Sequence, residues 1–293
     1  MKTLLVLLDG LGDRPVEKLG GKTPLGAARR KNLDWMCEHG KTGIMYPIGK
    51  GIAPESDEAA LALLGYDPFR YHTGRGPLEA MGWGVKFRPG EIVLRCNFTK
   101  ARKGWITDFQ FKPSEKDVKK YVRELNKIKI EGATLRFIKT LGYRAVLILK
   151  DSLSDRVSNT HPGYKIARNY VSSAQPRKGP LKIKKCRPLT KDKKAKRTAE
   201  IVNEFVRKSN EVLGDNLVVI TRGAGSGMPK IKKNYRGWAM MADTPVEKAV
   251  GKITGMTVAG KPENLEKLAG KVKTSLKKYN VYVQIKGPDT WAH

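Results

Sequence analysis

Two residues near the amino terminus have the side chains and the positions that phosphate or metal chemistry needs. The first, Asp9, follows the apolar run 4–8, which is typical of a buried parallel strand, and Gly10 eases the turn after it. Ligands of open α/β sheets bind at the carboxyl ends of strands, so Asp9 is a candidate metal or phosphate-site residue. The simpler interpretation is an ordinary Asp-Gly turn.

The second residue, Ser56, precedes a helical run over residues 58–64 and is therefore predicted at a helix N-terminus. Such a position offers unpaired backbone N–H groups and a favourable dipole to a phosphate. Ser56 is then either an ordinary N-cap or a nucleophile that accepts a phosphoryl group. Position alone favours the cap.

The composition indicates a folded protein with an unusual charge. The chain has 293 residues and is 40% hydrophobic, enough for one large domain or two ordinary ones. Its 58 Lys and Arg against 28 Asp and Glu give a net charge of +30, which attracts polyanions. A thermophile's charged surface normally adds both signs, so we expect an anionic partner, with RNA or a ribosomal particle favoured.

Three cysteines, Cys37, Cys96 and Cys186, are odd in number and unrelated in spacing. This pattern predicts reduced thiols rather than a disulfide framework or a zinc site, and hence a cytoplasmic location. The amino-terminal apolar run is short and lacks a small-residue cleavage site, so it does not resemble a signal peptide. We expect no membrane partner, because no segment is apolar for long enough to span a bilayer.

Several motifs, in one order from end to end, resemble those of the archaeal-type cofactor-independent phosphoglycerate mutases of the alkaline phosphatase superfamily. They occupy residues 9–15, 20–25, 56–68, 73–80, 95–98, 197–207, 222–225 and 286–293. Long motifs in a conserved order are far more specific than a lone glycine pattern. The resemblance implies an α/β fold with an alkaline-phosphatase-like three-layer core, a mainly parallel sheet and a smaller inserted α/β cap domain.

The resemblance also implies domains and a site. The core would comprise residues 1–75 and 196–293, and the cap residues 76–195, with a basic segment at 163–197. A serine in a two-metal site would take the phosphoryl group from one carbon of glycerate and return it to the neighbouring one, and divalent Mn or Mg would activate it.

Six positions carry over from the family. Ser56 matches the nucleophile, and with Asp9 it matches ligands of one metal. Asp289 and His293 match ligands of the other metal, four residues apart as on one helical face. Arg75 and Asn97 resemble residues that line the substrate pocket.

Three departures from the family pattern oppose catalysis. An arginine-rich run of the cap is replaced at residues 108–113, and a run with two acids and a histidine is altered at 157–163. The family also extends further at the carboxyl end, where it supplies an Asp-His pair and another histidine to the metal sites. We therefore expect an incomplete metal site and a partner chain that covers the missing part of the core.

The basic segment contains many cations and one acid, Asp192. Such a run is usually a solvated loop, but at this density it also suits an arm that follows nucleic-acid phosphates. The candidate nucleic-acid-binding residues are Arg177, Lys178, Lys182, Lys184, Lys185, Arg187, Lys191, Lys193, Lys194 and Lys196.

Three functions fit these observations. We favour a degenerate, non-catalytic member of the family that binds RNA or a ribosomal particle and needs no metal. The alternative is an active metal-dependent mutase that interconverts 3- and 2-phosphoglycerate through phosphoserine. A third hypothesis is a phosphatase or phosphotransferase with another substrate that uses Ser56.

Overall fold

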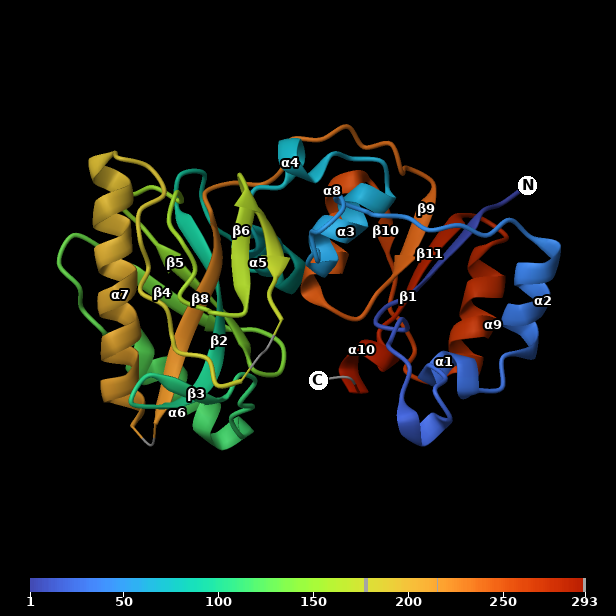
Figure 1. Cartoon of the computed structure of the whole chain (residues 1–293). Helices are drawn as coiled ribbons and strands as arrows, with labels where there is room; N and C mark the ends of the chain where they lie inside the picture. Colours follow the sequence, from blue (N-terminus) through green and yellow to red (C-terminus); the bar gives the residue numbers. More distant parts are fainter. Residues whose placement is uncertain (177–178, 215, 292–293) are drawn as a thin grey trace. The chain divides into compact units, whose positions relative to one another are not determined.

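The structure is a computed structural model that describes residues 1–176, 179–214 and 216–291 (Figure 1). Contacts divide the chain into two compact units, which are described separately. The first comprises residues 1–46, 234–243 and those from 255 onward, and the second comprises 47–233 and 244–254. Residues 47–75 and 196–233, assigned above to the core, lie in the second unit together with the predicted cap.

The first unit is built on a parallel four-stranded sheet in the order β1-β11-β9-β10. Its strands are β1 (Leu4–Leu8), β9 (Trp238–Met241), β10 (Thr257–Val258) and β11 (Asn280–Ile285). Its helices are η1 (Glu17–Leu19), α1 (Pro24–Ala27), α2 (Lys31–His39), α9 (Leu265–Ser275) and α10 (Gly287–Trp291). Leu268 of α9 packs against Val281 and Val283, so the helix covers one face of β11. The mixed α/β class and the parallel sheet agree with the sequence.

The second unit is built on an antiparallel five-stranded sheet in which β2 pairs with β3, β5 and β8. Its strands are β2 (Ile92–Arg102), β3 (Trp105–Asp108), β4 (Leu135–Lys139), β5 (Arg144–Leu149) and β8 (Leu217–Gly225), with a separate hairpin of β6 (Tyr164–Arg168) and β7 (Val171–Ala174). Its helices are α3 (Ser56–Leu63), α4 (Pro68–Tyr71), α5 (Arg75–Trp83), α6 (Glu115–Lys127), α7 (Lys193–Leu213) and α8 (Pro245–Thr254).

Strand β2 sends alternate residues to two helical layers, because side chains of a strand alternate between faces. Leu94 and Phe98 join the core that includes Leu125 of α6 and Phe205 of α7. On the opposite face Val93 packs with Ala80 of α5. Arg95 and Asn97 share the parity of Val93, so the sheet places them on the α5 side.

Helix α5 approaches β2 closely because Gly76 has no side chain. A Cβ atom at this position would lie 2.1 Å from the carbonyl oxygen of Val93. This contact brings the start of α5, where Arg75 lies, onto the polar part of the sheet.

Some predicted elements differ from the structure. The apolar pattern of residues 43–48 predicts a short strand, but the structure has none there, and Ile44, Met45 and Tyr46 are exposed. The prediction was wrong because an apolar run without a neighbouring strand has no hydrogen-bond partners. The sequence pattern predicts a helix from Thr198 to Leu213, but α7 starts five residues earlier, at Lys193. The Asp192 side chain caps it there by accepting from the backbone N–H of Ala195 at 2.8 Å.

The basic segment is therefore not one solvated arm. It contains the β6–β7 hairpin, an extended stretch before α7, and the first turns of α7. All three cysteine side chains are unbridged, as expected. Within the described ranges, no helix is both long and apolar enough to cross a bilayer.

Candidate functional site

Ser56 is the first residue of α3, and the helix N-cap is Glu55. The backbone N–H of Glu55 donates to the carboxylate of Glu58 at 3.1 Å, and the two residues form a capping box. The interpretation of Ser56 as the N-cap is therefore wrong. Its place at the helix start is confirmed, so the hydroxyl lies where the helix dipole favours an anion.

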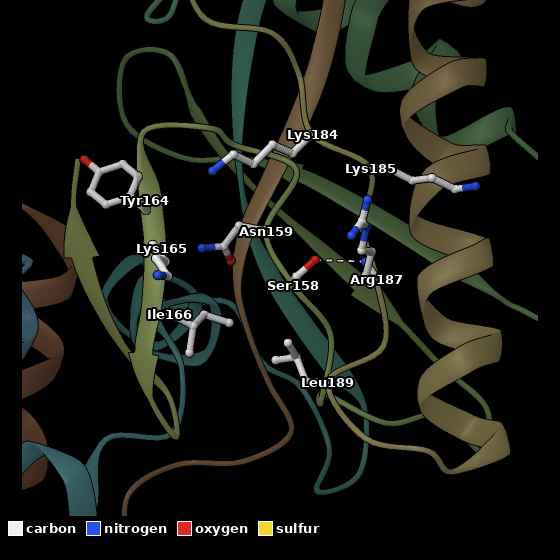
Figure 2. A pocket seen from close by; sticks show the side chains of 9 residues that line it. All are labelled: Ser158, Asn159, Tyr164, Lys165, Ile166, Lys184, Lys185, Arg187 and Leu189. Carbon is white, nitrogen blue, oxygen red and sulfur yellow. Dashed lines mark hydrogen bonds between the residues drawn. The ribbon is translucent and has the colours of Figure 1, made fainter. Parts of the chain in front are cut away.

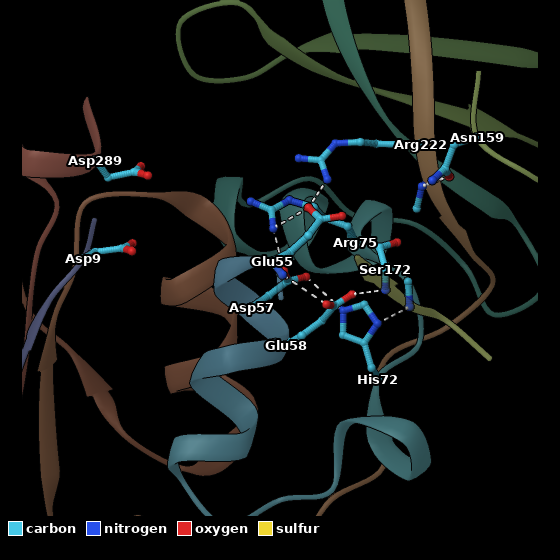
Figure 3. A network of polar contacts seen from close by, with 12 residues as sticks. Asp9, Glu55, Asp57, Glu58, His72, Arg75, Asn159, Ser172, Arg222 and Asp289 are labelled. Atoms are coloured by element: carbon cyan, nitrogen blue, oxygen red, sulfur yellow. Dashed lines mark hydrogen bonds and ion pairs between the residues drawn. The ribbon is translucent and has the colours of Figure 1, made fainter. Parts of the chain in front are cut away.

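The residues on either side of Ser56 are held by Arg75, which begins α5. Its Nη1 atom lies 2.9 Å from Glu55 Oε2 and 2.5 Å from Asp57 Oδ1. His72 contacts the other carboxylate oxygen of Asp57 at 2.9 Å (Figure 3). All four side chains are buried, so this network fixes the backbone that carries Ser56.

The network perturbs the ionisation of its members. Burial opposes a charge on Asp57, but Arg75 and the hydrogen bond to His72 outweigh it and hold the pKa of Asp57 well below its usual range. Burial would lower the pKa of His72, yet the hydrogen bond and charge of Asp57 raise it. Buried charges with partners on both sides indicate a rigid scaffold.

Glu58 joins this network to the β6–β7 hairpin. Its Oε1 atom accepts from the backbone N–H of Ser172 at 2.7 Å. Burial raises the pKa of Glu58 to about 8, with a further contribution from the charge of Asp57. The hairpin that carries part of the basic segment is thus tied to the helix that carries Ser56.

Arg222 extends the network onto the sheet. Its guanidinium pairs with Glu55 and lies 3.9 Å from the ring centroid of Tyr164. Burial lowers the pKa of Arg222 to about 9, which still leaves the guanidinium charged at neutral pH, where it pairs with Glu55.

Arg95 lies directly opposite Arg222 on the neighbouring strand. Arg95 is fully buried, and its Nε and Nη2 atoms have no hydrogen-bond partner. Burial and the nearby Arg144 lower the pKa of Arg95, and both guanidinium groups lie against the ring of Tyr143. This polar face of the sheet has a surplus of buried donors and suits an anion.

Asn97, a predicted pocket residue, lies on this same face opposite Arg144. Its Nδ2 atom donates to the carbonyl of Phe109 at 3.3 Å, and its buried Oδ1 atom has no hydrogen-bond partner. Asn97 and Arg75 thus border the cationic face, although Arg75 is committed to two carboxylates.

The first unit brings Asp9 and Asp289 together. The backbone N–H of Asp289 donates to the Asp9 carbonyl at 3.2 Å, and Figure 3 shows the two carboxylates side by side. The Lys286 ammonium lies 2.7 Å from Asp9 Oδ2 and 3.3 Å from Asp289 Oδ2. Gln284 also donates to Asp9, at 2.9 Å.

Carboxylate and amide oxygens suit a hard divalent cation, and the ammonium between the two acids shows that positive charge is favourable there. Asp9 and Asp289 therefore fit as part of a metal site. Nevertheless, no three His, Cys, Asp or Glu side chains of the described residues are grouped so that they could hold a metal. His293, the fourth predicted ligand, lies outside the described residues.

Sequence reasoning missed most of the network around Ser56. Glu55, Glu58, His72, Arg95 and Arg222 were not singled out as site residues. The sequence did contain an indication for Glu55 and Glu58. With Asp57 they place three acids within four residues at a helix start, which is more than helix capping requires. The cross-strand arginine pair depends on register, which the sequence does not reveal.

The comparisons with known proteins decide the family. Residues 37–218 match the model of the 2,3-bisphosphoglycerate-independent phosphoglycerate mutases. The enzyme of that name from Archaeoglobus fulgidus is 37% identical over the whole chain, which covers 75% of the relative. One from Methanothermobacter thermautotrophicus is 36% identical, with 94% of this chain and 68% of the relative covered. This chain belongs to the cofactor-independent phosphoglycerate mutase family.

Two solved structures support the same family assignment. The cofactor-independent phosphoglycerate mutase of Thermoplasma acidophilum matches with a TM-score of 0.53 and 30% identity, over 97% of this chain and 78% of that one. A Pyrococcus horikoshii protein matches with a TM-score of 0.65 and 26% identity, and the match covers 97% of this chain and 70% of that protein. The phosphoglycerate mutase family model spans Ser56, Arg75 and Asn97, whereas Asp9 and Asp289 lie outside the matched range.

Proposed function

We propose that this protein is a phosphoglycerate mutase that interconverts 3- and 2-phosphoglycerate through a phosphoserine at Ser56. The observation that carries the proposal is the buried network of Glu55, Asp57 and Arg75, which holds Ser56 at the start of α3. A nucleophile held in one orientation lowers the entropic part of the barrier to transfer. The whole-chain similarity to named mutases supports this function over the non-catalytic interpretation favoured by composition.

The substrate would be held by the cationic face of the sheet. Phosphoglycerate carries a carboxylate and a phosphate, and Arg95, Arg144 and Arg222 each have a buried nitrogen without a hydrogen-bond partner. These arginines could replace the arginine-rich run that is absent at residues 108–113. Planar guanidinium groups bind both kinds of anion through paired hydrogen bonds.

We also propose that Asp9 and Asp289 contribute oxygen ligands to a divalent metal, Mn or Mg. A divalent metal bound there would supply positive charge that offsets negative charge on a phosphoryl group. The Lys286 ammonium balances the charges of Asp9 and Asp289 in this structure, and a metal would have to displace it from their carboxylate oxygens. The expected result is a Mn-dependent rise in melting temperature that Asp9→Asn removes, measured by differential scanning fluorimetry.

The test of the main proposal is a coupled assay of phosphoglycerate interconversion with added Mn. The wild-type protein should be active, and Ser56→Ala should lower kcat at least about 10³-fold because the nucleophile is lost. Ser152→Ala, which alters an exposed loop serine, is the matched control and should leave the rate unchanged. An inactive wild-type protein with native-like melting would overturn the proposal, as would undiminished activity of Ser56→Ala.

A further inference from the structure

A basic pocket lies in the second unit between β6 and the extended stretch before α7 (Figure 2). We call it the lysine pocket; its volume is about 410 Å³ and its lining includes Lys165, Lys184, Lys185 and Arg187. None of the lining residues is acidic. Four cations without a counter-charge form a strongly anion-attracting concavity.

The backbone of this stretch is ordered by hydrogen bonds on both sides. The N–H of Ile183 donates to Gly104 at 2.9 Å, that of Lys184 to Thr160 at 2.9 Å, and that of Ser158 to Arg187 at 2.8 Å. Cys186 is buried in the main core. Ile183 and Cys186 are turned inward, whereas Lys182, Lys184, Lys185 and Arg187 are exposed, so the ordered backbone fixes where these four cations are attached.

Asn159 supplies a neutral donor in the same pocket. It is only 6% exposed, and its Oδ1 atom accepts from the backbone N–H of Gly223 at 3.0 Å. Its Nδ2 atom is buried without a hydrogen-bond partner, and Figure 2 shows it turned toward Lys165. A buried amide donor of this kind is unfavourable until an acceptor, such as a phosphate oxygen, reaches it.

The cationic surface continues past the pocket to an exposed aromatic ring. Lys182 lies 5.8 Å from the ring centroid of Trp105, and the two residues are joined by a backbone bridge. Trp105 is 48% exposed, so its ring is accessible for stacking. In an extended chain, Lys182 and Lys184 are about 6.7 Å apart. A row of cations beside an exposed ring fits a strand with unpaired bases better than one compact anion.

We propose that the lysine pocket and the adjoining Lys182 and Trp105 bind single-stranded RNA, with phosphates on the cations and a base on the ring. This binding does not use Ser56 and goes beyond the mutase function. Lys191, Lys193, Lys194 and Lys196 lie near the start of α7 and do not line the pocket. Arg177 and Lys178 lie outside the described residues.

The experiment measures anisotropy of a labelled single-stranded RNA of about 16 nucleotides over a range of salt concentrations. The test variant carries Lys184→Gln, Lys185→Gln and Arg187→Gln. The matched control carries Lys116→Gln, Lys119→Gln and Lys120→Gln, which remove the same charge from exposed positions of α6.

The pocket variant should bind about 10–100-fold more weakly, with its salt slope reduced by about 2, because three phosphate contacts are lost. The control variant should bind nearly as the wild type does. Equal losses in both variants would show a diffuse charge effect and overturn the proposal, as would the absence of RNA binding by the wild type.

Two further arms sharpen the test. Asn159→Asp keeps the acceptor for Gly223 but replaces the donor by a negative charge, so it should weaken RNA binding about tenfold at an unchanged melting temperature. Inorganic tripolyphosphate serves as the small-anion probe and should compete only weakly. Tight, pocket-dependent binding of tripolyphosphate without RNA binding would overturn the proposal in favour of a small-ligand site.

Discussion

The two units contain polar centres of similar composition but opposite exposure. In the second unit, Asp57 and Arg75 are almost completely enclosed, and each has more than one charged partner. In the first unit, the side chains of Asp9 and Asp289 are 24% and 27% exposed and share one ammonium. The enclosed centre is suited to hold a backbone still, whereas the open one is suited to exchange ions with solvent.

Their sheets show the same contrast. Residues 92–98 of β2 are buried throughout, whereas Leu4 and Val6 of β1 are 44% and 46% exposed. β2 has partners on both sides, while β1 pairs only with β11 among the described strands. The polar centre on the enclosed sheet should therefore be far more sensitive to mutation, and four predictions test this.

The largest effect is expected for Arg75→Met. It would leave the buried carboxylates of Glu55 and Asp57 without their shared cation, and should destabilise the second unit by about 3–5 kcal/mol. Urea unfolding, combined with hydrogen exchange resolved by unit, measures the loss. A loss below about 1 kcal/mol would show that the network contributes little.

The second prediction concerns pH. The pKa of Glu58 rises from 4.5 to about 8, and that of His72 rises above 6.5. Both protonated groups therefore stabilise the folded state at low pH, and this stabilisation is lost as pH increases. The lowered pKa of Asp57 has the opposite effect: the ionised carboxylate stabilises the folded state, and this stabilisation is lost as pH falls below 3.8. From pH 5 to 9 the unfolding free energy should therefore fall, on the order of 1–3 kcal/mol.

Glu58→Gln isolates one part of this pH effect. The variant cannot lose a proton at position 58, so its stability curve should be flatter between pH 5 and 8. Chemical unfolding at several pH values provides the comparison. An unchanged slope would contradict the assignment of the effect to Glu58.

The third prediction moves to the open centre. Gly10 has a φ of +74°, and a Cβ atom there would lie 2.6 Å from the backbone of Asp289. Gly10→Ala should therefore cost about 1–3 kcal/mol and separate the two carboxylates. Gly12→Ala is the matched control, because a Cβ atom at that position meets nothing within 4 Å. Equal stabilities of the two variants would contradict the close approach.

The smallest effect is expected for Lys286→Met. Because Asp9 and Asp289 are partly solvated, removing their shared ammonium should change stability by at most about 1 kcal/mol. The same unfolding assay allows a direct comparison with Arg75→Met. Similar losses from both substitutions would mean that the two centres do not differ in the way proposed.

Much of the secondary structure could be predicted from local pattern. The apolar patterns of residues 4–8 and 281–285 predict strands that agree with β1 and β11 to within a residue. The positions of Asp9 after a strand and Ser56 at a helix start were also foreseen. The strand expected at 43–48 failed because strand formation needs a partner, which local pattern does not contain.

The family, the mixed α/β class and the residues that could do chemistry can all be inferred without coordinates, because they depend on residue identity and on order along the chain. Three relations could not be inferred in this way: Glu55 rather than Ser56 caps α3, Arg95 lies opposite Arg222, and Lys286 bridges two acids. These relations join residues far apart in the chain through strand register and close packing. Both are set by the burial of the whole core rather than by any local signal.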